Sequence, residues 1–127
     1  MPEDNTTPVK VVVGKSFHSI VLDNDSDVLI EYYAPWCGHC KKLSPIWDQL
    51  AEELKEVPHL TIAKMDATAN EVEGVDIRGY PTLKWYPKGD KKNPVDFDGE
   101  RDLDSIKAWL KEHSASYKHH LEHKSEL

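Results

Sequence analysis

The sequence has few of the features that mark specialised classes of protein. It contains two cysteines in 127 residues, too few for a disulfide-dense secreted scaffold. No run approaches 18 consecutive apolar residues, so no segment is expected to span a membrane. Basic residues are scarce, with 16 Lys and Arg against 23 Asp and Glu. The resulting net charge of -7 argues against binding to a nucleic-acid backbone.

The remaining composition describes one folded domain of ordinary size. Hydrophobic residues make up 39% and charged residues 31%, which is neither a disordered nor a membrane composition. A domain of this length buries roughly two thirds of its unfolded surface, so it needs no covalent staple. The two cysteines therefore need an explanation other than fold stability.

The two ends of the chain are polar. The first residues lack the basic and apolar regions of a signal peptide, and we expect residues 1–7 to be a linker and residues 114–127 a tail. Lys-Ser-Glu-Leu at 124–127 is similar to the tetrapeptides that retain proteins in the endoplasmic reticulum, although Ser125 replaces the usual Asp and so short a motif also arises by chance. If the signal is real, we expect the chain to be the C-terminal piece of a longer protein.

The predicted elements alternate as in an α/β domain. Short β-branched or apolar runs predict strands, the second of them buried on both faces, at residues 9–13, 28–34, 60–65, 81–86 and 95–97. Apolar residues at spacings of three and four predict helices at residues 16–22, 38–55 and 103–113, with a weaker pattern at 67–75. The first strand is expected at a sheet edge, and Asp102 is the predicted N-cap of the last helix.

The two cysteines lie together in Cys37-Gly38-His39-Cys40, between a buried strand and a helix. The first residue of such a turn meets unpaired backbone N–H groups and the positive end of the helix dipole, which favour a thiolate. His39 would add a positive charge when protonated. Because two cysteines at this spacing can also close a disulfide within one helical turn, the motif suits a redox pair.

Three other interpretations of the cysteine pair are weaker. A structural disulfide across four residues would contribute only about 2 kcal/mol, against about 5 kcal/mol for a hundred-residue loop. A zinc site would need two more ligands, and the His-x3-His pair His119 and His123 lies in the expected tail without zinc-finger spacing. Inert core thiols fit poorly beside Trp36, Gly38 and His39, which suit an exposed turn. We therefore expect no metal site.

The residues around the motif resemble one known family. The run APWCGHCK at residues 34–41 is similar to the active-site signature of the protein disulfide isomerases. The likeness covers residues 8–113 and includes the runs at 28–33, 63–68 and 79–82. It is strongest to the C-terminal catalytic domain of a multidomain isomerase. The resemblance implies an α/β thioredoxin fold, in which helices cover both faces of a central mixed sheet.

The resemblance also implies roles for the residues of the motif. Cys37 would attack substrate disulfides, and Cys40 would resolve the mixed disulfide. Gly38 and His39 separate them, and His39 would make the pair more oxidising by stabilising the Cys37 thiolate. Thioredoxin-like reductants commonly have Pro at that position. Trp36 is expected at the exposed site, in contact with substrate.

Four residues outside the motif belong to the implied site. Glu31 would be a buried acid that accepts the Cys40 proton through a water, with Lys64 as its basic partner. The sequence alone also allows a solvated carboxylate at the sheet margin and a solvated lysine. Pro81 would be cis and face the cysteines, which would leave the Tyr80 backbone free to pair with an extended substrate.

Arg101, in the turn before the last predicted helix, has two interpretations. It matches a mobile loop arginine of the family, which would approach Cys40 and lower the pKa of that thiol. It is equally well an ordinary turn residue. The sequence does not separate the two.

The sequence thus predicts a domain that forms, reduces and isomerises protein disulfides. No organic cofactor is expected, because the two thiols carry the electrons. Expected partners are unfolded or misfolded proteins with cysteines, and glutathione or an upstream oxidase. We expect a monomeric domain of a larger chain in the endoplasmic reticulum lumen. The rivals are a non-catalytic peptide-binding or chaperone module, which would typically lack one cysteine, and a dedicated reductant, which His39 disfavours.

Overall fold

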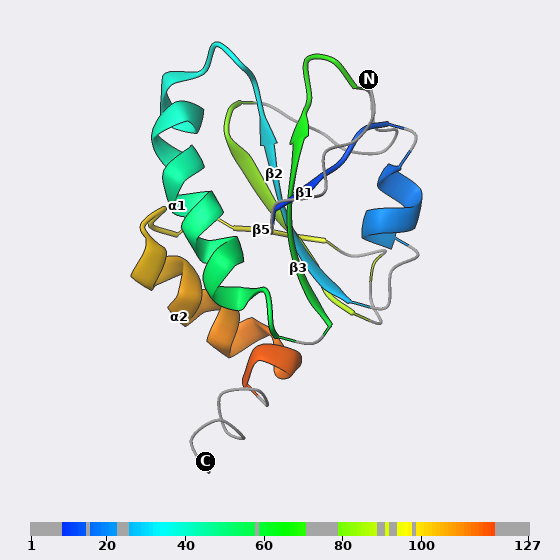
Figure 1. The fold of residues 1–127 in the computed structure, drawn as a ribbon, viewed down its shortest axis with the longest axis vertical. Coiled ribbons are helices and arrows are strands. Elements are labelled where there is room, and N and C mark those ends of the chain that lie inside the picture. Colours follow the sequence, from blue (N-terminus) through cyan, green and yellow to red (C-terminus); the bar gives the residue numbers. More distant parts are fainter. Residues whose placement is uncertain are drawn as a thin grey trace.

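The computed structural model of the chain describes residues 9–14, 16–22, 26–57, 59–70, 79–88, 91, 94–97 and 99–118. These residues form a five-stranded mixed sheet with helices on both faces (Figure 1). The strands are β1 (Lys10–Val11), β2 (Asp27–Tyr33), β3 (Leu60–Asp66), β4 (Thr82–Tyr86) and β5 (Val95–Asp96). Their order across the sheet is β1-β3-β2-β4-β5, so β1 lies at an edge, as predicted, and β2 at the centre.

Strand β2 carries the middle of the sheet. It is parallel to β3 and antiparallel to β4, and all of it except Tyr33 is buried. The prediction of a strand buried on both faces is therefore confirmed. Since side chains alternate along a strand, Leu29 and Glu31 share one face, while Ile30 and Tyr32 share the other.

Helices cover the two faces unequally. The two long helices, α1 (Gly38–Leu54) and α2 (Leu103–His113), lie on one face, and the short wide-turned helix η1 (His18–Leu22) lies on the other (Figure 1). The Asp102 carboxylate accepts the backbone N–H of Ser105 at 2.9 Å, which confirms the predicted N-cap of α2. The short helix predicted at 67–75 lies mostly outside the described residues, and its first part forms a turn.

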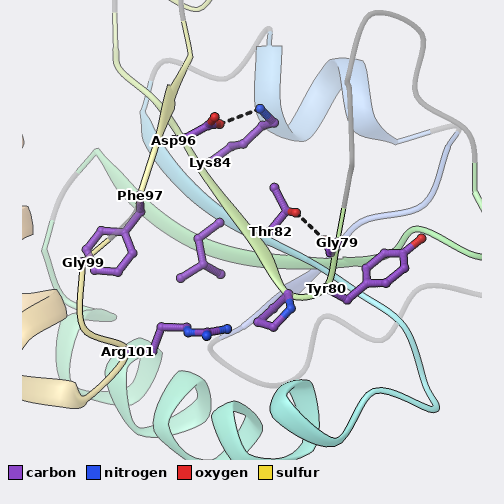
Figure 2. A pocket seen from close by; sticks show the side chains of 10 residues that line it. Gly79, Tyr80, Thr82, Lys84, Asp96, Phe97, Gly99 and Arg101 are labelled. Carbon is purple, nitrogen blue, oxygen red and sulfur yellow. Dashed lines mark hydrogen bonds and ion pairs between the residues drawn. The ribbon is translucent and has the colours of Figure 1, made fainter.

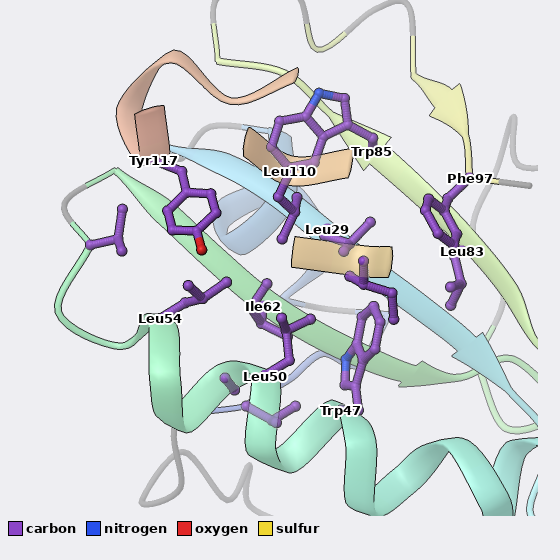
Figure 3. Close-up of a cluster of buried hydrophobic side chains, with 14 of the residues drawn as sticks. Leu29, Trp47, Leu50, Leu54, Ile62, Leu83, Trp85, Phe97, Leu110 and Tyr117 are labelled. Carbon is purple, nitrogen blue, oxygen red and sulfur yellow. The ribbon is translucent and has the colours of Figure 1, made fainter. Parts of the chain in front are cut away.

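The larger core lies between the sheet and the two long helices (Figure 3). Leu29 of β2, Trp47 and Leu50 of α1 and Leu110 of α2 are each at most 1% exposed. The Trp47 indole N–H donates to the Ala63 carbonyl at 2.8 Å, so this buried polar group is satisfied. The contact fixes α1 over β3, and the first turn of α1 then lies at the carboxyl end of β2.

The packed domain extends beyond its predicted end at residue 113. Ser114 is 1% exposed and Tyr117 is 5% exposed, and residues 115–118 form a further helical turn. The boundary between domain and tail therefore moves to residue 118 at least. The remainder of the predicted tail lies outside the described residues, as does the predicted linker at 1–7.

A buried carboxylate holds this C-terminal turn against the sheet. Asp27 at the start of β2 is 5% exposed, and its Oδ2 accepts the Ser114 hydroxyl at 2.7 Å. Its Oδ1 accepts the backbone N–H of Lys88 at 2.7 Å. The Ser114 hydroxyl in turn accepts the Tyr117 N–H at 3.1 Å. Donors from two distant segments thus replace the water that the carboxylate loses on burial.

Replacing Ser114 with alanine is expected to lower the free energy of unfolding by about 2 kcal/mol. The change leaves Asp27 Oδ2 and Tyr117 N without their hydroxyl partner, and buried polar groups left unpaired cost about 1–3 kcal/mol. Urea denaturation followed by tryptophan fluorescence measures the loss. Ser116→Ala, in the same turn, is the matched control, with an expected change below about 0.5 kcal/mol. Equal losses in the two variants would show that the hydroxyl network does not hold the turn.

Candidate active site

The two cysteines lie at the start of α1, directly after the central strand. Cys37 is the N-cap residue of the helix, and its Sγ accepts the backbone N–H of Cys40 at 3.2 Å. The residues are 6% and 5% exposed, and no disulfide joins them. One sulfur therefore lies on the unpaired N–H groups of the helix start, as the sequence predicts.

Burial disfavours the charged form of the Cys40 sulfur. It raises the pKa of the Cys40 thiol to about 12, and a hydrogen bond to the Cys37 side chain and the nearby Glu31 charge act in the same direction. Cys40 is therefore a thiol near neutral pH. To act as a nucleophile it needs a base that takes its proton.

Glu31 is a carboxylate placed to interact with Cys40. It is 3% exposed on the face of β2 that α1 covers, so it is buried rather than solvated at a sheet margin. Burial raises its carboxyl pKa to about 7, with opposing contributions from the positive charges of Lys64 and Arg101 and a supporting one from Asp48. A group with this pKa both accepts and releases a proton at neutral pH.

Lys64 lies beside Glu31 in the sheet without contacting its carboxylate. The two residues are register partners in β2 and β3. Among the described residues, no ion pair within 4 Å joins them, and the ammonium lies 5.9 Å from the centroid of the Tyr33 ring. Its charge lowers the pKa of Glu31 through space. Lys64 is thus a neighbouring charge of Glu31 rather than a contact partner.

Tyr33 is a site residue that is absent from the sequence-based predictions. Its ring packs against the cluster formed by Ala34, Cys37 and Cys40. Burial raises the pKa of its hydroxyl, and the negative charges around it act in the same direction. The signal was present, because Tyr33 follows Glu31 by two residues and must share its face of the strand.

Two aromatic rings, one exposed and one half-buried, flank the cysteines. Trp36 is 70% exposed, and its ring meets that of Tyr80 edge to face, with 5.6 Å between centroids. Tyr80 also packs against the cysteine cluster. The Tyr80–Pro81 peptide bond is cis. The residues expected to contact substrate are thus brought together beside the thiols.

Arg101 lies where two hollows meet. With the exposed His39 and residues of α1, it lines a hollow of about 170 Å³ beside the first helical turn. It also lines a groove of about 650 Å³ that begins at Gly79 and Tyr80 (Figure 2). The structure therefore places this arginine at the edge of the cysteine site.

The described residues contain no group of three or more His, Cys, Asp or Glu side chains arranged to hold a metal ion. His119 and His123 lie outside that part of the chain. In the same part, no helix is both long and apolar enough to cross a bilayer.

Known proteins are similar to this chain in sequence and in fold. The thioredoxin family model matches residues 8–112. Protein disulfide-isomerase of Gallus gallus is 51% identical over 111 residues, which are 87% of this chain and 22% of the relative. Protein disulfide-isomerase A4 of Homo sapiens is 54% identical over 117 residues, which are 90% of this chain and 18% of the relative. The chain thus spans about a fifth of the length of these relatives.

A solved structure of a single domain has a similar fold. The first thioredoxin domain of mouse protein disulfide-isomerase A4 superposes with a TM-score of 0.73 and 38% sequence identity. The match covers 87% of this chain and 79% of that one.

Proposed function

This chain belongs to the thioredoxin family, with protein disulfide isomerases among its relatives, and on that premise we propose that it is a thiol-disulfide oxidoreductase acting through Cys37 and Cys40. The observation that carries the proposal is the contrast between the two sulfurs. Cys37 Sγ accepts an N–H group at the start of α1, whereas burial keeps Cys40 protonated. A thiol-disulfide oxidoreductase needs one sulfur that attacks the substrate and a second that resolves the mixed disulfide.

The steps follow from these positions. Cys37, as a thiolate, attacks one sulfur of a substrate disulfide, so a bond to Cys37 forms and the other substrate sulfur leaves as a thiolate. Glu31 takes the proton of Cys40 through a water, and the Cys40 thiolate attacks Cys37 Sγ. The substrate leaves reduced, and the pair holds a disulfide. The reverse sequence oxidises a substrate dithiol, and attack followed by rearrangement within the substrate isomerises it.

The natural substrates in this proposal are unfolded or misfolded proteins with cysteines. The exposed Trp36 ring and the half-buried Tyr80 ring offer an apolar surface beside the thiols, and such a surface suits an unfolded chain. Glutathione or an upstream oxidase resets the pair. The retention-like residues 124–127 and the relatives' greater length support a domain of a longer enzyme in the endoplasmic reticulum lumen.

The direct test uses the domain with its cysteine pair prepared in the oxidised or in the reduced form. We expect it to reduce insulin and to recover activity in a protein with scrambled disulfides, in glutathione buffer. Insulin reduction without recovery of the scrambled protein would favour a dedicated reductant. Inactivity in both assays would refute the proposal.

Replacing His39 with proline is expected to make the pair a poorer oxidant. The equilibrium constant with glutathione should move by at least about tenfold toward the oxidised pair, or about 30 mV. The change removes an imidazole whose positive form stabilises the Cys37 thiolate. Because the His39 N–H lies in the first turn of α1, proline does not break a helical hydrogen bond there.

The control for this prediction is His59→Asn. His59 is exposed and has a positive φ of 61°, a conformation that asparagine adopts readily, so the fold is preserved. The equilibrium constant of the His59→Asn domain with glutathione should match that of the wild type. An unchanged constant in His39→Pro would remove His39 from the proposed redox machinery.

A further inference from the structure

A groove beside the cysteine pair has a lining that the proposed electron transfer does not use. It has a volume of about 650 Å³ and runs between the start of β4 and the segment that follows β5 (Figure 2). Tyr80 lines one end of it and also packs against the cysteines. Since sites for small ligands measure about 300–1,000 Å³, the groove has room for a short segment of a bound chain.

Strand β5 covers only part of β4 along this groove. Strand β5 pairs with β4 at Lys84 and Trp85, and the Phe97 N–H donates to the Leu83 carbonyl at 2.9 Å. Within the described residues, that side of β4 has no strand partner at Thr82, which pairs only with β2 on its other side. An extended chain entering from the cysteines is therefore not blocked by a strand at Thr82, whose own N–H and C=O point toward β2 because backbone groups alternate along a strand.

The two cations that line the groove differ in whether they form an ion pair. The Lys84 ammonium lies 2.6 Å from Asp96 Oδ1, so this cation has a counter-charge in contact (Figure 2). Arg101 is exposed and, among the described residues, makes no ion pair within 4 Å. Figure 2 shows its side chain reaching from its loop across the groove toward the start of β4. The groove thus presents one positive charge without a counter-charge in contact, in a chain of net charge -7, while the same charge acts through space on the buried Glu31.

We propose that this groove binds an extended substrate segment in which an acidic residue lies a few positions from the reacting cysteine, and that Arg101 binds its carboxylate. The inference rests on the proposed function. A guanidinium binds a carboxylate through two parallel hydrogen bonds, and it stays charged at any physiological pH. Arg101 is then a specificity-determining residue.

The test follows oxidation of short peptides that carry two cysteines. The peptide dithiol gives up two electrons and two protons and becomes a disulfide, while the Cys37–Cys40 disulfide gains them. Peptides are made in pairs that differ only by Glu or Gln, at successive positions on either side of the first cysteine. The oxidised domain reacts with each, and the ratio of the two second-order rate constants isolates the effect of the carboxylate.

At one or two positions the wild-type domain is expected to oxidise the Glu peptide about fivefold to tenfold faster than the Gln peptide. The ratio should fall to about one in Arg101→Gln, and toward one for the wild type in about 0.5 M NaCl. Lys111→Gln removes an exposed cation of α2 outside the groove, and it should keep the wild-type ratio.

Three results would overturn this inference. They are a wild-type ratio of about one at each position, a ratio that survives in Arg101→Gln, and an equal loss of rate for both peptides in that variant. The last would place the effect of Arg101 on the cysteines rather than on the substrate. If the wild-type domain oxidised none of the peptides, the proposed function itself would fall, and this inference with it.

Discussion

Replacing Cys37 with serine is expected to reduce the rate of insulin reduction by about a thousandfold or more. A serine hydroxyl remains protonated at neutral pH and does not form a bond equivalent to the mixed disulfide, so the first step is lost. The hydroxyl still accepts the Cys40 N–H as an N-cap, because serine is among the preferred residues at that position. The fold should therefore be kept, and circular dichroism checks this.

Cys40→Ser gives the matched comparison for the same step. It leaves Cys37 in place, so the variant should still attack substrate disulfides but should fail to release the product. Mixed disulfides between Cys37 and the substrate should accumulate and be visible on non-reducing gels. Comparable mixed disulfides in Cys37→Ser would contradict the assignment of Cys37 as the nucleophile.

The elements that carry this chemistry could be predicted from local sequence. The nearly continuous apolar run at 28–34 indicates a buried strand, and the spacing of three and four residues after it indicates a helix. These signals are local, because a strand and a helix each bury side chains at a fixed period. The structure places both where expected, with Cys37 at the junction. The redox pair is therefore the most predictable part of the site.

The contacts that depend on distant segments could not be read this way. Ser114 and Tyr117 lie in a stretch whose composition is polar, yet both are buried. What holds them is the Asp27 carboxylate, 87 residues away from Ser114 in the sequence. No periodicity encodes such a partner, because a single buried hydrogen bond leaves no repeat in the chain. The same holds for Lys64, whose ammonium lies over the Tyr33 ring instead of against Glu31.

Replacing Glu31 with glutamine is expected to raise the free energy of unfolding at pH 8 by about 3 kcal/mol. The carboxyl pKa rises from its ordinary 4.5 to about 7 in the folded domain, so the native state binds this proton more tightly than the unfolded state. The side chain's contribution to stability is complete below about pH 4.5 and is lost as the pH rises through about 7. A shift of this size corresponds to about 3 kcal/mol.

Urea denaturation across pH 4 to 8 measures this effect. Glutamine stays neutral, so the difference between variant and wild type should be small at pH 4, grow between about pH 4.5 and 7, and then level off. Glu112→Gln, an exposed carboxylate of α2, should track the wild type within about 0.5 kcal/mol. A difference that did not change with pH would contradict a raised pKa at Glu31.

The same substitution is expected to slow the resolving step, because glutamine accepts no proton from Cys40. Rapid quenching at pH 7 should show mixed disulfides that form at the wild-type rate and resolve on the order of a hundredfold more slowly, the scale of general-base catalysis. Equal slowing of both steps would refute the role of Glu31 as the base. A variant that is more stable and yet slower would show that the domain keeps a buried acid at a cost in stability. The Cys40 thiol, which burial holds at a pKa of about 12, needs that acid as a proton acceptor within reach of a shared water.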